Sequence, residues 1–177
     1  MEFILIAMVL FVFIFFMADL VLRQATLGKL DRVSYSVAGV LRERIQLYDA
    51  REELNQQDVD QSLALAKRVL KDMNSTADLS AMGIAVEEIH FEDPRDLSDT
   101  SKTVKMSHTW HSGAAQGCQA PQPLNNLQQL SPRGSYGRWV PLYQVTLCIP
   151  TISWYTRLTS GLDMQPVMSS FSVVILR

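Results

Sequence analysis

Residues 3–22 read FILIAMVLFVFIFFMADLVL, and every residue in this run except Asp19 is apolar. At about 1.5 Å of rise per residue, a helix of this length spans roughly 30 Å, the thickness of the hydrocarbon core of a bilayer. The run therefore predicts a membrane-spanning helix and argues against a purely cytosolic enzyme. The side chains that we expect in the bilayer include Phe3, Leu10, Phe16 and Leu22.

A cleaved signal peptide would need a basic start, an apolar run of about 7–15 residues and a cleavage site flanked by small residues. Residues 1–22 lack a basic start, and the sequence around Asp19 continues in helical composition without a small-residue site. We therefore expect a single-pass helix that is not removed.

The apolar pattern continues beyond the membrane-length run in steps of three and four. Its members are Leu27, Leu30, Ser34, Val37, Leu41, Ile45 and Tyr48. Gly28 and Gly39 weaken a helix by up to about 1 kcal/mol each without ending it. The pattern predicts one helix from about residue 2 to residue 50, with a membrane half at 1–22 and an amphipathic half at 23–50.

The remainder, residues 51–177, predicts a small α+β head with a second helix and an antiparallel sheet. Asn55 followed by Asp58 resembles an N-cap with an acidic first turn, so we expect the helix over about residues 56–73. Alternating or short apolar runs predict strands near residues 84–91, 103–110, 139–149 and 169–176. A change of phase between Val86 and Ile89 predicts a bulge in the first strand.

The segment 112–137 is rich in Gly, Pro, Gln, Asn and Ser, and it carries Cys118. In the strand that follows, Tyr143, Val145, Leu147 and Ile149 alternate with residues on the opposite face, among them Cys148. We expect the long segment to cover that second face of the sheet.

The orientation of the membrane helix has two opposing indicators. Arg23, Lys29 and Arg32 all follow the apolar run, and the positive-inside tendency would place that side in the cytoplasm. Cys118 and Cys148 suit one disulfide in an oxidising compartment such as a bacterial periplasm. Two unpaired thiols in a reduced domain are the alternative.

Charge and motif content exclude several functional classes. The net charge is −2 with interleaved signs, which offers no basic field for nucleic acid. His108 and His111 with the two cysteines do not have the spacing of a zinc site, and no catalytic or phosphate-binding motif occurs. We therefore expect neither a metal nor a cofactor, and no enzymatic activity. Glu87 and Glu88 are expected to solvate the end of a strand.

Two acids next to the membrane segment are candidates for contacts between subunits. Asp19 is costly inside a bilayer unless it reaches the interface or a partner, and Arg23 lies four residues on, within pairing reach along a helix. A plain interfacial ion pair is the alternative. Glu2 begins the apolar run, where it favours the positive end of the helix dipole. It is either a headgroup-level residue or a group that neutralises the N-terminal amine of a neighbouring chain.

Several segments resemble the minor pilins of the TadF type, from the tight-adherence (Tad or Flp) form of type IV pilus. The most specific segments are Leu30-Asp-Arg-Val-Ser-Tyr-Ser36 and Leu41-Arg-Glu-Arg44, within the run from Ala18 to Tyr48. Trp139-Val-Pro-Leu-Tyr-Gln-Val-Thr-Leu-Cys148, Ser153-Trp154 and the Ser-rich final strand are also similar. The resemblance covers most of the chain.

The resemblance implies a pilin-like fold, a periplasmic head and a disulfide between the cysteines. It also implies a short basic leader that a prepilin peptidase removes, and it assigns the family's acid to Glu2. Pilin acids usually stand fifth after the cleavage site, so the resemblance predicts a natural start upstream of Met1.

These features lead us to expect a non-enzymatic pilus subunit in the bacterial inner membrane. Its expected partners are the lipid bilayer, other pilins or pseudopilins, the inner-membrane assembly platform and the prepilin peptidase. The alternatives are a signal-anchored periplasmic sensor or scaffold that does not enter a filament, and an anchored enzyme, for which the sequence shows no polar cleft.

Overall fold

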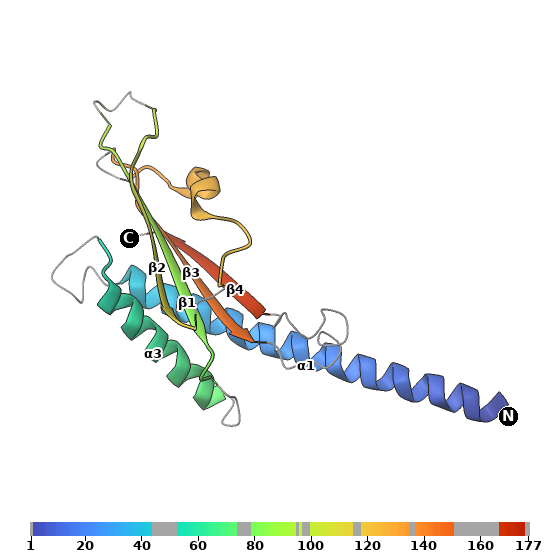
Figure 1. Ribbon diagram of the computed structural model, residues 1–177. Coiled ribbons are helices and arrows are strands. Elements are labelled where there is room, and N and C mark those ends of the chain that lie inside the picture. Colours follow the sequence, from blue (N-terminus) through green and yellow to red (C-terminus); the bar gives the residue numbers. More distant parts are fainter. Residues whose placement is uncertain are drawn as a thin grey trace.

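The computed structural model of the chain describes residues 2–43, 53–73, 79–94, 96, 100–114, 118–134, 137–150 and 167–175. It has two α-helices, one 3-10 helix and four strands in these ranges (Figure 1). They are α1 (Glu2–Arg42), α3 (Gln56–Met73), β1 (Gly83–Phe91), β2 (Val104–Gly113), η1 (Leu124–Leu130), β3 (Leu142–Pro150) and β4 (Val167–Ile175). The predicted α+β class is confirmed.

Helix α1 is a single element of 41 residues, and its N-terminal half projects away from the rest of the molecule (Figure 1). Gly28 and Gly39 lie inside it without interrupting it, as the sequence predicts. The predicted continuation over residues 44–50 lies outside the described residues.

Helix α3 begins and ends at the residues that the sequence predicts. The Asp58 amide donates to Asn55 Oδ1 at 2.9 Å, and the Asn55 amide donates to Asp58 Oδ2 at 3.0 Å. This reciprocal pair satisfies amide groups that have no partner within the helix, and it fixes where α3 starts.

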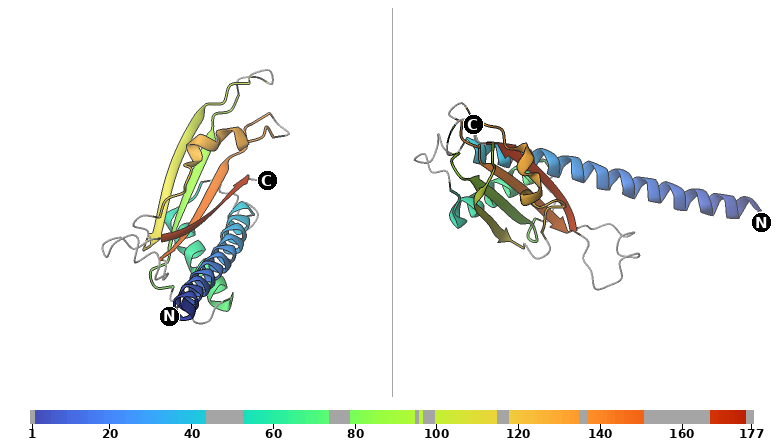
Figure 2. Two further views of the ribbon diagram at one scale, coloured as in Figure 1. Left: turned by 90° about the vertical axis from the view of Figure 1, so that its right-hand side faces the viewer. Right: turned by 90° about the horizontal axis from the view of Figure 1, so that it is seen from above.

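The four strands form one antiparallel sheet in the order β2-β1-β3-β4. Helix α1 packs along β3 and β4, and α3 packs along β2 and β1, so both helices lie on one face (Figure 2). The opposite face of β1 and β3 is covered by the segment that contains η1. The sheet is therefore a central layer with a cover on each side.

The double cover explains the phase change in β1, which is not a bulge at the predicted place. Ile84 and Val86 face the helices, whereas Ile89 and Phe91 pack with Leu124 of η1 on the other side. The pairing of β1 with β2 is continuous from Gly83 to His90, and it shifts only between His90 and Phe91. Strand β1 therefore has the predicted irregularity, but at its end, and the phase change arises because the strand is buried on both faces.

Candidate assembly and anchoring site

The N-terminal half of α1 is apolar and uncovered. Phe3 is 82% exposed, Leu10 is 54% exposed and Leu22 is 68% exposed, while Phe16 is partly buried. Among the described residues, α1 is the one helix that is long and apolar enough to cross a membrane, and the rest of the protein buries none of its apolar window. Such a large apolar surface would be unfavourable in water, so it is suited to lipid or to other apolar helices.

The three polar residues predicted for this site lie at two levels of α1. Glu2 is its first residue. Asp19, which is partly buried, and Arg23, which is exposed, stand one helical turn apart near the end of the apolar half. At 3.6 residues per turn they share the face that carries Leu30 and Ser34 further along the helix. The structure thus brings Asp19 and Arg23 to one face and leaves Glu2 at the far tip.

The outward face of α1 stays open where the head covers its other side. Tyr35 is 67% exposed and Val40 is 43% exposed. A Cβ atom added at Gly28 or at Gly39 would meet nothing within 4 Å. The open face of the apolar half therefore continues along the half that carries the head.

A polar seam joins the buried face of α1 to β4. Ser34 is fully buried, and its hydroxyl lies 3.1 Å from the Ser170 hydroxyl and 3.0 Å from that of Ser172. Ser170 also donates to the Asp31 carboxylate. Residues 30–36 and the Ser-rich final strand, two of the segments that resemble TadF-type pilins, thus meet in one hydrogen-bonded contact.

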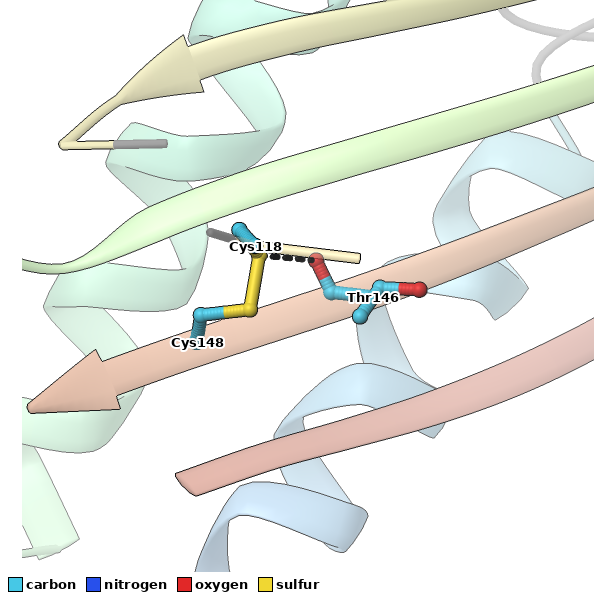
Figure 3. Close-up of a disulfide and its surroundings, with 3 residues drawn as sticks. All are labelled: Cys118, Thr146 and Cys148. Carbon is cyan, nitrogen blue, oxygen red and sulfur yellow. Dashed lines mark hydrogen bonds between the residues drawn. A yellow bond between two sulfur atoms is a disulfide. The ribbon is translucent and has the colours of Figure 1, made fainter. Parts of the chain in front are cut away.

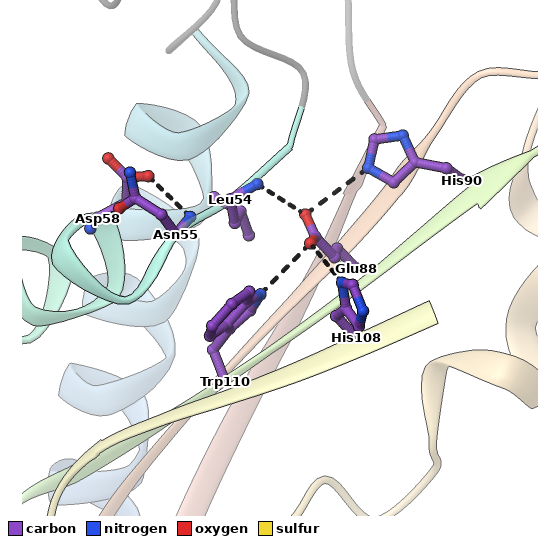
Figure 4. Close-up of polar contacts among 7 residues, drawn as sticks. All are labelled: Leu54, Asn55, Asp58, Glu88, His90, His108 and Trp110. Carbon is purple, nitrogen blue, oxygen red and sulfur yellow. Dashed lines mark hydrogen bonds and ion pairs between the residues drawn. The ribbon is translucent and has the colours of Figure 1, made fainter. Parts of the chain in front are cut away.

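Glu88 is a buried carboxylate with several polar partners, which the sequence did not lead us to expect. It is fully buried in β1, and its carboxylate accepts the Leu54 amide at 3.0 Å and Trp110 Nε1 at 3.3 Å (Figure 4). His90 Nε2 and His108 Nδ1 each lie 3.6 Å from one of its oxygens, which is an ion-pair distance when the imidazoles are protonated.

Burial raises the pKa of Glu88, but His90 and the donors Leu54 and Trp110 lower it by more. The pKa therefore lies below its ordinary value. The carboxylate is therefore held ionised where the segment before α3 meets the sheet. Glu87, its neighbour, accepts the Leu124 amide at 2.6 Å and so holds η1 on the opposite face.

The prediction that Glu87 and Glu88 solvate the end of a strand was wrong. Both lie inside β1, between the apolar pairs Ile84 and Val86 on one side and Ile89 and Phe91 on the other. That enclosure by apolar residues is the sequence signal that indicates buried acids with fixed partners.

Cys118 and Cys148 form a disulfide, with their Cα atoms 5.6 Å apart (Figure 3). Both residues are buried, and with Ala85 they form a small cluster on the face opposite the helices. The bond ties the covering segment to the last part of β3.

A second attachment holds the far end of the covering segment. Lys102 Nζ donates to the carbonyl oxygens of Gln128 and Ser131, each at 2.8 Å, and lies 4.2 Å from the centroid of the Trp139 ring. Trp139 Nε1 in turn donates to the Ser101 carbonyl at 2.9 Å. Burial lowers the pKa of Lys102.

The two histidines weighed as metal ligands are not brought together. His108 and His111 are three residues apart in β2, so they lie on opposite faces of the strand. In the part of the chain that the structure describes, no group of histidine, cysteine and carboxylate side chains is arranged to hold a metal ion. The arrangement of the described residues supports anchoring and packing.

Comparison with known proteins agrees with this structural picture. The family model TadF, described as "putative tight adherence pilin protein F", matches residues 1–177, which is the whole chain. No curated protein matches the chain, and no solved structure matches it. The chain belongs to the TadF family of tight-adherence pilin proteins.

Proposed function

We infer that this chain is a minor pilin or pseudopilin that takes part in assembling or priming a Tad pilus for adhesion. The observation that carries the proposal is the single helix α1, whose first half is apolar and uncovered and whose second half is fixed to the head. A simple anchored domain would not require this rigid continuity. A filament subunit does, because its head must follow the packing of its helix.

Packing is the mechanism that we propose. In the membrane, Phe3 to Leu22 contact lipid; in the pilus, they contact the apolar helices of other pilins or pseudopilins. The open face with Gly28, Tyr35 and Gly39 extends that contact into the half that carries the head, since its small residues let another helix approach closely.

We propose that the polar residues of α1 set how neighbouring helices align along their axes. Glu2 neutralises the N-terminal amine of a neighbouring chain inside the helical bundle, and Asp19 pairs with Arg23 or with a neighbouring subunit at the membrane boundary. An uncompensated charge in an apolar bundle is costly, so both contacts favour one alignment of the helices.

The proposed location is the bacterial inner membrane, with a single pass and a periplasmic head. The disulfide supports this orientation because disulfides persist in oxidising compartments. The proposed partners besides other pilins are the inner-membrane assembly platform and the prepilin peptidase that processes the subunit.

Replacement of Glu2 by Ala tests the proposal in cells. We expect Glu2→Ala to abolish piliation while the chain stays in the membrane fraction, with Glu92→Ala, at an exposed acid of the head, as the matched control. Unchanged piliation would refute the role of Glu2. Loss of the chain from the membrane fraction would show that the substitution acts on insertion instead.

A further inference from the structure

The second helix runs back toward the membrane half of the first. Helix α3 starts beside the C-terminal end of α1, and its own C-terminal end lies on the side from which the apolar half of α1 projects (Figure 1). Met73 at that end and Leu27 of α1 pack against the same core. The last turns of α3 therefore belong to the part of the head nearest the membrane.

This end of the molecule is basic, although the whole chain carries −2. Residues 19–32 and 67–73 together hold six basic and three acidic residues. The basic ones are Arg23, Lys29, Arg32, Lys67, Arg68 and Lys71. Arg68 and Lys71 are exposed, and neither forms an ion pair within the described residues. Exposed acids such as Glu92 and Asp93 follow β1, at the end of the head far from the apolar half (Figure 1).

The distances suit the headgroup layer of a bilayer. With Leu22 at the edge of the hydrocarbon core, Lys29 and Arg32 stand roughly 10–15 Å above that edge at about 1.5 Å per residue. The headgroup layer occupies about 5–8 Å of that height. The remaining gap of roughly 2–10 Å is comparable with the length of a lysine or arginine side chain and with the Debye length of about 8 Å.

We propose that Arg23, Lys29, Arg32, Lys67, Arg68 and Lys71 form a membrane-proximal basic surface that binds the headgroups of anionic phospholipids. Arginine and lysine near a surface are attracted to anionic lipid, and two helices that contribute basic side chains give the head two points of contact. The surface therefore fixes the tilt of the head on the membrane. The inference rests on the proposed membrane anchoring of α1, but it holds for either orientation of the chain.

Hydrogen exchange of the full chain in bilayers tests this proposal. The chain is reconstituted in phosphatidylcholine alone and in phosphatidylcholine mixed with phosphatidylglycerol, and the amides of residues 67–73 are followed. We expect exchange several-fold slower with phosphatidylglycerol, and we expect high salt or the double substitution Arg68→Gln with Lys71→Gln to abolish the difference. The matched control, Lys105→Gln with Arg138→Gln, removes two exposed basic residues elsewhere and should keep it.

Equal exchange in both lipids would overturn the proposal. So would a double variant that exchanges faster by the same factor in both lipids, because the two residues would then serve only the C-terminal end of the helix. Slower exchange with inorganic phosphate in neutral bilayers would assign the surface to a free anion. Alkaline extraction distinguishes failure of the anchoring from failure of this inference. A chain that is extracted from the bilayer contradicts the proposed anchoring of α1. A chain that stays inserted, but whose exchange does not depend on the lipid, contradicts the basic surface alone.

Discussion

Ser34 in α1 and Ser170 in β4 are joined by a buried hydrogen bond, with 3.1 Å between their hydroxyl oxygens, although 136 residues separate them in the chain. The contact lies where the helix that carries the apolar half meets the last strand of the sheet. It therefore helps to fix the direction in which α1 leaves the head.

Substitution of Ser34 by Ala should weaken this joint. The change removes the contacts with Ser170 and Ser172 from a buried site, so we expect a loss of about 1 kcal/mol in the free energy of unfolding. Urea unfolding of the full chain in detergent measures it. Ser36→Ala is the matched control, because Ser36 is exposed and its hydroxyl donates to the Arg32 carbonyl of its own helix. Equal effects of the two substitutions would contradict the role of the seam.

Glu88→Gln should destabilise the head by about 1–3 kcal/mol, because it removes the charge that the surrounding donors favour inside the protein. The control is Glu92→Gln, which changes an exposed acid just after the same strand. The same unfolding measurement near neutral pH compares them. A Glu88→Gln variant as stable as the control variant would show that the carboxylate has no structural role.

The acid limit of stability follows from the same residue. The pKa of Glu88 in the folded state lies below its ordinary value of 4.5, so the unfolded chain binds the proton more readily. The stability that Glu88 contributes is fully present at pH values above its pKa in the unfolded chain. It is lost as the pH falls through its pKa in the folded protein. Between about pH 5 and about pH 2, we expect the free energy of unfolding to fall less steeply in Glu88→Gln than in the unsubstituted protein. An identical decline in both proteins would contradict the lowered pKa.

The disulfide should stabilise the covering segment. The bond encloses a segment with a sequence separation of 30, so its removal should cost about 3–4 kcal/mol. Paired Cys118→Ala and Cys148→Ala substitutions test this by unfolding, and proteolysis should then cut first between residues 118 and 134. Thiol trapping of the native protein is the direct control. Two free thiols would contradict both the bond and the argument for a periplasmic head.

Substitution by Ala should have opposite effects on stability at Gly113 and at Gly28. Gly113 ends β2 with φ of 75°, and an added Cβ would lie 2.5 Å from the Met82 carbonyl oxygen, so Gly113→Ala should destabilise the head. Gly28 is inside α1 with open space around it, so Gly28→Ala should stabilise the helix by up to about 1 kcal/mol. Thermal unfolding of both variants checks the signs, and a destabilised Gly28→Ala would show that its open face is packed in the sample.

The elements of this fold follow from local pattern, and several are predictable from the sequence. Spacings of three and four residues predict α1, and Asn55 with Asp58 predicts the start of α3. Alternation in β3 places Tyr143 toward the helices and Cys148 toward the covering segment, as observed. These signals suffice because each depends on residues close together in the chain.

The contacts between elements depend on topology, which the local pattern does not contain. Glu88 reads as a solvated acid until β1 is known to be a central strand that meets Leu54. The bond of Ser34 to Ser170 likewise requires the order of the sheet. The resemblance to a family does mark the two partner segments, but it gives no reason for their contact. The roles of Glu2 and of the pair Asp19 and Arg23 stay predictions.

Photocrosslinking from Leu10, which is exposed on the apolar half of α1, tests whether that half packs against other pilus subunits. We expect a photoreactive residue at position 10 to form adducts with the apolar helix of another pilus subunit in piliated cells, and with lipid alone when the assembly platform is deleted. Adducts with lipid alone in piliated cells would refute the proposed packing of α1 with other pilus subunits, because the chain would then be a membrane anchor that never joins the assembly.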